Sequence, residues 1–223
     1  MRPVLLIAGN FFREQRILLA LMVAYVVLGG GTLALLPHAP EIEDVIFLIK
    51  QHAAYAVLLG VALASTAIHN ERKSKRILAV LSKGITRGQY LAGMLLGSVS
   101  VLLAYLFWLG IIATALLERV GVAAAQGWTV LGIAATATLL AAAITIFYST
   151  FAHPWVALPL TLITIAVPIF PVAVLLKELA AWNPGAGMSL NEGLVGMALV
   201  ETLLFWGLAA WSFRNKDIAV AVE

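Results

Sequence analysis

Glu201 is the acidic side chain that lies nearest the centre of a long apolar stretch, residues 194–213. A charged side chain at the centre of a bilayer costs on the order of 3 kcal/mol on insertion scales. A carboxylate in this position is therefore a candidate for binding a substrate or an ion. The alternative is that a neighbouring Thr, Ser or backbone group satisfies it at a seam between subunits, and the sequence leaves both readings open.

Three prolines in the apolar stretch 155–177 form the second candidate group: Pro159, Pro168 and Pro171. Each proline removes a backbone hydrogen bond and can kink a helix. A kinked helix in a membrane can act as a gate hinge, or the kink can be static and satisfied by packing. We take Pro168 and Pro171, together with Glu201, as candidate pathway or hinge residues.

Catalysis within the membrane requires paired polar groups at depth, such as Ser with His or two Asp, and the apolar stretches offer no such pair. The chain has 0 cysteines, which excludes thiolate metal sites and cysteine nucleophiles. The four histidines are scattered over both predicted faces of the membrane, so we predict no metal site. We therefore expect that this chain is not an enzyme.

Lys50, Gln51 and His52 interrupt the second apolar stretch. Pro40, Glu41, Glu43 and Asp44 have the pattern of a first helical turn, so Lys50 would lie only about 15 Å along that helix. We expect these polar side chains to reach the outer interface by snorkelling.

The amino-acid composition indicates that these residues lie in a membrane. The 223 residues are 62% hydrophobic and 11% charged, with a mean hydropathy of +1.01, whereas soluble domains have about 45–50% apolar and about 25% charged residues. Each of six apolar stretches approaches or exceeds the roughly 20 residues that cross a bilayer. We predict six transmembrane helices at 17–36, 45–69, 90–117, 128–151, 155–177 and 194–213.

The basic residues predict the orientation of these spans. Eleven of the 14 Lys and Arg fall on one predicted side, in the amino-terminal segment, the 70–89 link and the carboxy-terminal tail. The positive-inside rule places this side, with both termini, in the cytoplasm. The net charge of +3 then reflects topology, and no nucleic-acid partner is indicated. Before the first span, the apolar residues of segment 3–14 are followed by charges, which predicts an interfacial helix or an extension of that span.

The 70–89 link has the pattern of a short amphipathic helix. Arg72, Arg76 and Lys83 share one face at spacings of four and seven, and a second face is apolar, so we expect a helix over 72–83. The apolar face comprises Ile77, Leu78 and Leu81. One function of such a helix is to bind a protein partner. The other is simple anchoring of its positive charges at anionic lipid headgroups.

A turn and a second helix follow in the sequence. Gly84 is placed to end the first helix. Thr86, with Gln89 three residues later, matches a capping box, which predicts that a new helix begins here and continues into the third span. The link would then be a rigid cytoplasmic projection.

The same link resembles the signature between the second and third spans of ABC type-2 permeases. Glu71 precedes a Leu-rich stretch, which is followed by the run Ser82-Lys83-Gly84-Ile85-Thr86-Arg87 and then by Tyr90 and Gly93. The segment 7–14 is similar to the opening segment of the family. The chain departs from the family pattern at Gly84, where Pro is usual, and at Met94, where Lys often follows the glycine.

This resemblance implies an all-α membrane protein that is the single permease domain of a half-transporter. Two such subunits, identical or different, would form the substrate pathway, and separate ABC ATPase subunits would dock beneath them and carry the ATP and Mg²⁺. In the family, the segment corresponding to 70–89 couples the ATPase to the spans. That role falls here on Glu71, Arg76, Leu78, Leu81 and Arg87. Most members of the family export their substrates from the cytoplasm.

The chain lacks the phosphate-binding loop that ATP hydrolysis requires, so we expect the energy to come from the ATPase partner. The resemblance therefore implies a transport permease, of the type-2 exporter class, in a prokaryotic plasma membrane. Membrane lipid, a second permease subunit and the ATPase are the expected partners. A non-transporting scaffold or assembly subunit of a larger complex fits the same six spans.

Overall fold

The computed structural model describes residues 2–35, 37–38, 40–73, 84–184 and 191–214. The regular secondary structure of these residues is helical, as expected of an all-α protein. Its elements are α1 Arg2–Glu14, α2 Arg16–Ala34, α3 Ile42–Lys73, α5 Arg87–Arg119, α6 Ala124–Ser149, α7 Pro154–Ala166, α8 Pro171–Ala181 and α9 Glu192–Arg214.

Among the described residues, five helices are long and apolar enough to cross a membrane: α2, α3, α5, α6 and α9. The pair α7 and α8 passes the same test together, but is bent by 70° at the break between the two helices. The prediction of a helical membrane-spanning protein is thus confirmed. The number of spans is six if α7 and α8 together cross the membrane as one broken segment.

Prolines determine where the α7–α8 break falls. α7 contains Pro159 within its length yet remains helical. It ends at Ala166, and Val167 has extended backbone angles (φ −75°, ψ 121°) because the residue before a proline is disfavoured in the helical region. Pro171 occupies the first turn of α8, where a missing N–H is tolerated. The prolines therefore produce a complete break in the helix, where the sequence had predicted a kink.

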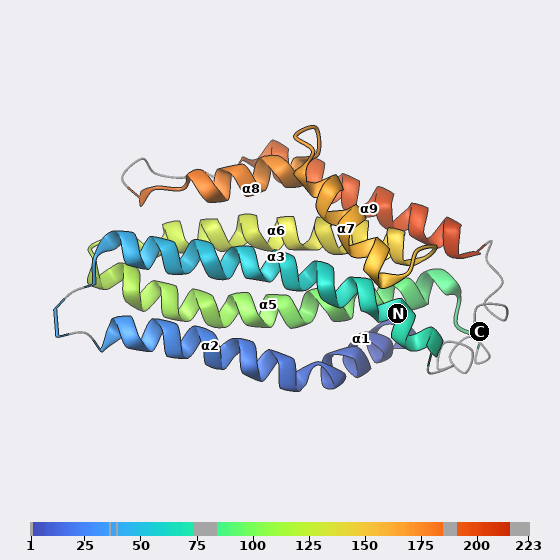
Figure 1. Ribbon diagram of the computed structural model, residues 1–223, viewed down its shortest axis with the longest axis horizontal. Helices are drawn as coiled ribbons and strands as arrows, with labels where there is room; N and C mark the ends of the chain where they lie inside the picture. Colours follow the sequence, from blue (N-terminus) through green and yellow to red (C-terminus); the bar gives the residue numbers. More distant parts are fainter. Residues whose placement is uncertain (1, 36, 39, 74–83, 185–190, 215–223) are drawn as a thin grey trace.

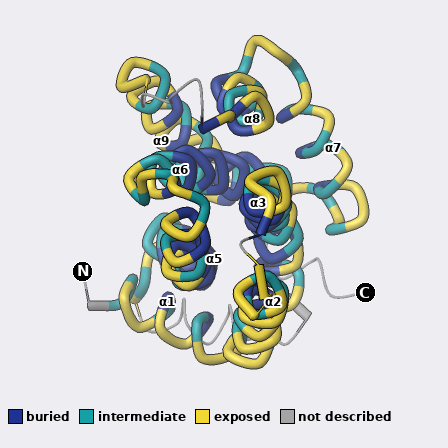
Figure 2. Tube along the Cα trace, turned by 90° about the vertical axis from the view of Figure 1, so that its left-hand side faces the viewer, coloured by how far each residue is buried: buried dark blue, intermediate teal, exposed yellow. Residues whose placement is uncertain are grey.

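The helix α6 lies at the centre of the bundle, with α8 and α9 on one side and α5 and α2 on the other (Figure 1). Figure 2 shows the burial concentrated on α6 and on the facing sides of α3 and α5, while α2 and α7 are largely exposed. Small side chains allow this close packing. The fully buried alanines of α6 include Ala134, Ala137, Ala141, Ala142 and Ala143.

The amino-terminal helix α1 packs against α5 through two glycines. A Cβ atom at Gly93 would lie 2.7 Å from Cβ of Ile7, and one at Gly97 would lie 2.9 Å from Cβ of Phe11. Both distances are too short for carbon atoms in contact, so glycine is required for this approach. The contact holds α1 along the first turns of α5.

Candidate functional site

The start of α5 is a sharply defined corner. Gly84 has φ +78°, in the left-handed region that glycine occupies without strain. The backbone N–H of Gln89 donates to Oγ1 of Thr86 at 3.3 Å, and the N–H of Thr86 donates to Oε1 of Gln89 at 3.1 Å. The predicted capping box is therefore confirmed, and α5 begins at Arg87, directly after it. We call residues 84–89 the elbow.

Arg87 joins the elbow to the end of α9. Its Nη1 donates to the carbonyl oxygens of Phe213 at 2.7 Å and Arg214 at 2.8 Å. The last carbonyls of a helix lack partners within the helix and carry partial negative charge, so a guanidinium stabilises them. The Arg87 guanidinium carbon also lies 5.8 Å from the centre of the Phe213 ring, on which Tyr90 stacks at 6.4 Å. The resemblance gave Arg87 a coupling role, and the structure places its side chain on the end of α9.

The other predicted coupling residues lie at the end of α3 or outside the described residues. Glu71 belongs to the last turn of α3, which continues to Lys73. Arg76, Leu78 and Leu81 lie outside the described residues, as does the predicted helix over 72–83 apart from its first two positions. Arg87 is thus the coupling candidate whose contacts the structure describes.

Glu201 lies nine residues into α9 and is partly buried. Its Oε2 atom is buried, and the described residues provide no hydrogen-bond partner for it. By helical spacing, Glu201 shares a face with Phe205 four residues later. The ring of Phe205 lies 5.9 Å from that of Phe147 and 6.5 Å from that of Phe170, the residue immediately before α8. This face of α9 therefore looks towards α6 and the α7–α8 break, where Pro168 and Pro171 lie.

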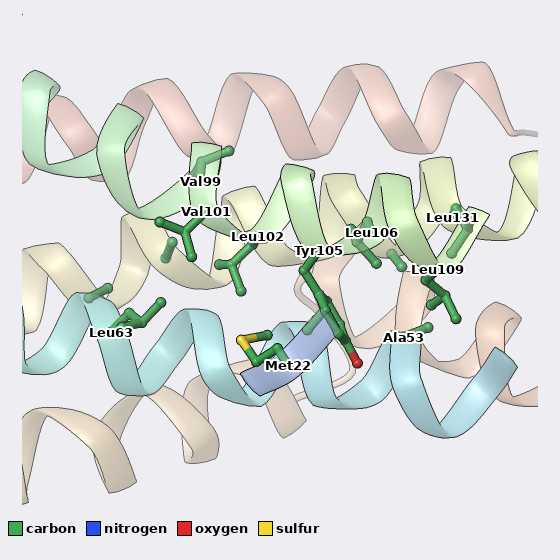
Figure 3. Close-up of a cluster of buried hydrophobic side chains, with 14 of the residues drawn as sticks. Met22, Ala53, Leu63, Val99, Val101, Leu102, Tyr105, Leu106, Leu109 and Leu131 are labelled. Atoms are coloured by element: carbon green, nitrogen blue, oxygen red, sulfur yellow. The ribbon is translucent and has the colours of Figure 1, made fainter. Parts of the chain in front are cut away.

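A polar and aromatic cluster lies between α2, α3 and α5, with its α2 member, Tyr25, half exposed. The Nδ1 atom of His52 lies 2.7 Å from the hydroxyl oxygen of Tyr105, and Tyr105 projects from α5 towards α3 in Figure 3. Both residues are buried, with 2% and 1% of their surface exposed. The ring of Tyr25 lies 4.9 Å from that of His52, and Tyr55 lies 5.9 Å from it.

The expectation that residues 50–52 reach the outer interface by snorkelling is wrong for His52, which is held inside the bundle by Tyr105. The amide of Gln51 donates to the Tyr55 hydroxyl at 2.7 Å. The ammonium of Lys50 donates to the carbonyl oxygen of Ala180 at 2.7 Å, near the carboxy-terminal end of α8. Each of the three polar side chains therefore has a partner in the protein.

Two of the histidines that the sequence places far apart are neighbours. The rings of His69, near the end of α3, and His153, before α7, lie 4.7 Å apart. In the part of the chain that the structure describes, His, Cys, Asp and Glu form no group of three that could hold a metal ion. This pair is thus a contact between α3 and the start of α7.

The His52 cluster, with its buried His52–Tyr105 pair, is the feature that the sequence analysis missed. A signal existed, because Gln51, His52 and Tyr55 recur at helical spacing, and Tyr25 and Tyr105 lie well inside neighbouring spans. The spacing, however, does not say which tyrosine faces which histidine.

Comparison of the chain with protein-family models finds no match, and comparison with curated proteins finds none either.

Proposed function

We propose that this chain is the membrane-spanning permease subunit of an ATP-binding-cassette transporter. Two such subunits form the substrate pathway, and a separate ATPase subunit that carries ATP and Mg²⁺ drives them. The subunit lies in a prokaryotic plasma membrane with both termini in the cytoplasm and acts in export. Three features support this proposal: the resemblance of the 70–89 link to the permease signature, the arrangement of apolar helices and the charge distribution.

The contacts that fix the elbow to α5 and α9 are the main structural support for the proposal. A coupling segment must convert the movement of a docked partner into movement of the spans, so its junction with the spans must be stiff. The capping box fixes the start of α5, and Arg87 ties that start to the last carbonyls of α9. A displacement of the 70–89 link would therefore reach α5 through the chain and α9 through Arg87.

The candidate pathway residue Glu201 lies on α9, the helix that Arg87 joins to the elbow. α9 carries Glu201, whose buried carboxylate oxygen has no partner among the described residues. A buried charged group in a membrane faces a subunit seam or an aqueous pathway, because exposure to lipid is unfavourable. We assign Glu201 to the pathway or the seam, and the α7–α8 break with Pro168 and Pro171 to the hinge that moves beside it.

The test is co-purification of the ATPase with the tagged full-length chain from membranes of its native host. Changing Leu78→Ser and Leu81→Ser together should release the ATPase, because loss of a buried apolar anchor costs about 2 kcal/mol or more, which exceeds a tenfold loss of affinity. The matched control neutralises three basic residues of the same link that lie outside the assigned coupling set and should retain the ATPase. These residues are Arg72, Lys73 and Lys75.

The outcomes of this experiment distinguish docking through the apolar face, docking through charge and a scaffold role. Full retention of the ATPase by the double Leu→Ser variant would refute docking through the apolar face. Release by the neutralised variant alone would assign docking to charge. If the wild-type chain purifies with other membrane proteins but never with an ATPase, the chain is a scaffold or assembly subunit.

A further inference from the structure

Two hollows lie along the seam between α5 and α9, at the end of the bundle where α5 begins and α9 ends. The outer hollow has a volume of about 560 Å³ and is lined by residues of the elbow and the last turns of α9, including Arg87, Trp211 and Arg214. The inner hollow has a volume of about 370 Å³ and is lined by residues of α1, α5, α6 and α9, including Ala92 and Trp206. Neither hollow is lined by Glu201 or by residues of the His52 cluster.

The two hollows follow the same stripe of each helix. On α5 the stripe consists of residues spaced by four, three and four: Gly88, Ala92, Leu95 and Val99. On α9 it consists of residues spaced by three, four and four: Leu203, Trp206, Ala210 and Arg214. Such spacings place side chains on one helix face. Because Arg87 binds the end of α9, the two helices run in opposite directions, and the inner hollow lies about 10 Å further along the seam at 1.5 Å per residue.

The outer hollow is suited to an anion at the membrane surface. Among the described residues, Arg87 and Arg214 line it and no acidic residue does so. Trp211, also in its lining, is 67% exposed, and tryptophan is enriched at the level of lipid headgroups. Basic side chains at this level attract anionic lipids.

The inner hollow is suited to a hydrocarbon chain. Apart from Thr202 and the indole of Trp206, its lining residues are aliphatic, and the Thr202 hydroxyl is already bonded to the Ala198 carbonyl at 2.8 Å. An apolar hollow on the surface of a membrane-spanning bundle cannot be stabilised by water, since water there would lack hydrogen-bond partners. Acyl chains surround the surface and can enter it.

We propose that the α5/α9 seam binds one anionic phospholipid, with its phosphate between Arg87 and Arg214 in the outer hollow and an acyl chain in the inner hollow. The occupant is a lipid because the hollow bordered by Arg87 and Arg214 and the apolar hollow follow one another along one stripe, in the order of headgroup and chain. Within the 70–89 link, the site uses the elbow residues Thr86, Arg87 and Gly88. The bound lipid spans the joint that Arg87 makes between α5 and α9, so it stabilises that joint.

The test measures lipids retained by the purified full-length chain, by native mass spectrometry after exchange into detergent with added lipid. Phosphatidylglycerol and phosphatidylcholine with identical acyl chains are compared. The wild-type chain should retain one phosphatidylglycerol, with at least tenfold preference over phosphatidylcholine. Arg214→Gln should weaken that retention about fivefold, because one basic group near the surface contributes roughly that factor. Arg13→Gln, which removes an exposed basic residue lining neither hollow, should leave it unchanged.

A second variant tests the acyl-chain hollow. Ala92→Phe narrows the inner hollow and should reduce the retention of phosphatidylglycerol, while Arg87 and Arg214 stay in place. Millimolar inorganic phosphate should not displace the lipid, because phosphate makes no contact with the inner hollow. Equal retention of the two lipids, equal effects of Arg13→Gln and Arg214→Gln, or complete displacement by phosphate would each overturn the proposal. If Ala92→Phe does not fold, the Arg214→Gln comparison still decides it.

Discussion

The Nδ1 atom of His52 on α3 lies 2.7 Å from the hydroxyl oxygen of Tyr105 on α5, and both side chains are buried. This hydrogen bond links two of the longest helices at a point about 15 Å along α3 from Ile42. Buried polar atoms that lose their partner are destabilising, so the pair acts as a clamp on the relative position of α3 and α5.

Removal of this clamp should destabilise the protein. Tyr105→Phe keeps the ring but leaves the imidazole of His52 without its hydroxyl partner, so we expect a loss of about 1–3 kcal/mol. The control is Tyr55→Phe, which removes the hydroxyl that accepts from Gln51 at a less buried position and should have a smaller effect. Thermal unfolding in detergent measures both. Equal melting temperatures for the wild-type and Tyr105→Phe chains would show that the bond contributes nothing.

Two arginines at opposite ends of α5 make similar contacts with neighbouring helices. Arg87 binds the carbonyls at the end of α9, and the Nη1 of Arg119 donates to the carbonyl oxygen of Ala34, the last residue of α2. Arg87→Gln should loosen the last turns of α9, and Arg119→Gln should loosen the end of α2 instead. Hydrogen exchange should speed up several-fold for amides of the affected end only. Faster exchange at both ends in either variant would indicate general destabilisation and contradict the assigned joints.

The role of Glu201 can be separated from its effect on folding. Glu201→Gln removes a charge whose buried oxygen has no partner among the described residues, so the variant should fold at least as well as the wild-type chain. If Glu201 serves the pathway, substrate-stimulated ATPase activity of the complex should change at least several-fold. Glu192→Gln, at the exposed first turn of α9, is the matched control. Wild-type activity in a well-expressed Glu201→Gln complex would leave packing as its role.

The orientation of the chain can be tested directly, since its 0 cysteines provide a clean background. Single cysteines at Ser74 and Asn215 should react only from the cytoplasm, and one at Gly185 only from outside, because eleven of the 14 basic residues fall on the side of Ser74. An impermeant thiol reagent applied to intact cells and to opened vesicles distinguishes the two sides. Labelling of position 74 in intact cells would reverse the proposed topology.

Local features of this protein could be read from the sequence. Apolar stretches of sufficient length predicted the helices α2, α3, α5, α6 and α9, because hydrophobicity and helix length depend on neighbouring residues alone. The Thr86–Gln89 capping box was predictable for the same reason, since its partners are three residues apart. The α7–α8 break was only partly predicted, because a proline shows where a helix is weakened but not whether the two halves separate.

Contacts between distant segments were decided by the tertiary structure. His52 meets Tyr105 across 53 residues, Arg87 meets Phe213 across 126, and Lys50 meets Ala180 across 130. Each of these partners is one of several polar groups at a suitable depth, and the sequence pattern does not rank them. Helix packing selects the partner. The glycines and alanines of α5 and α6 determine which helices approach closely and which faces they present to one another.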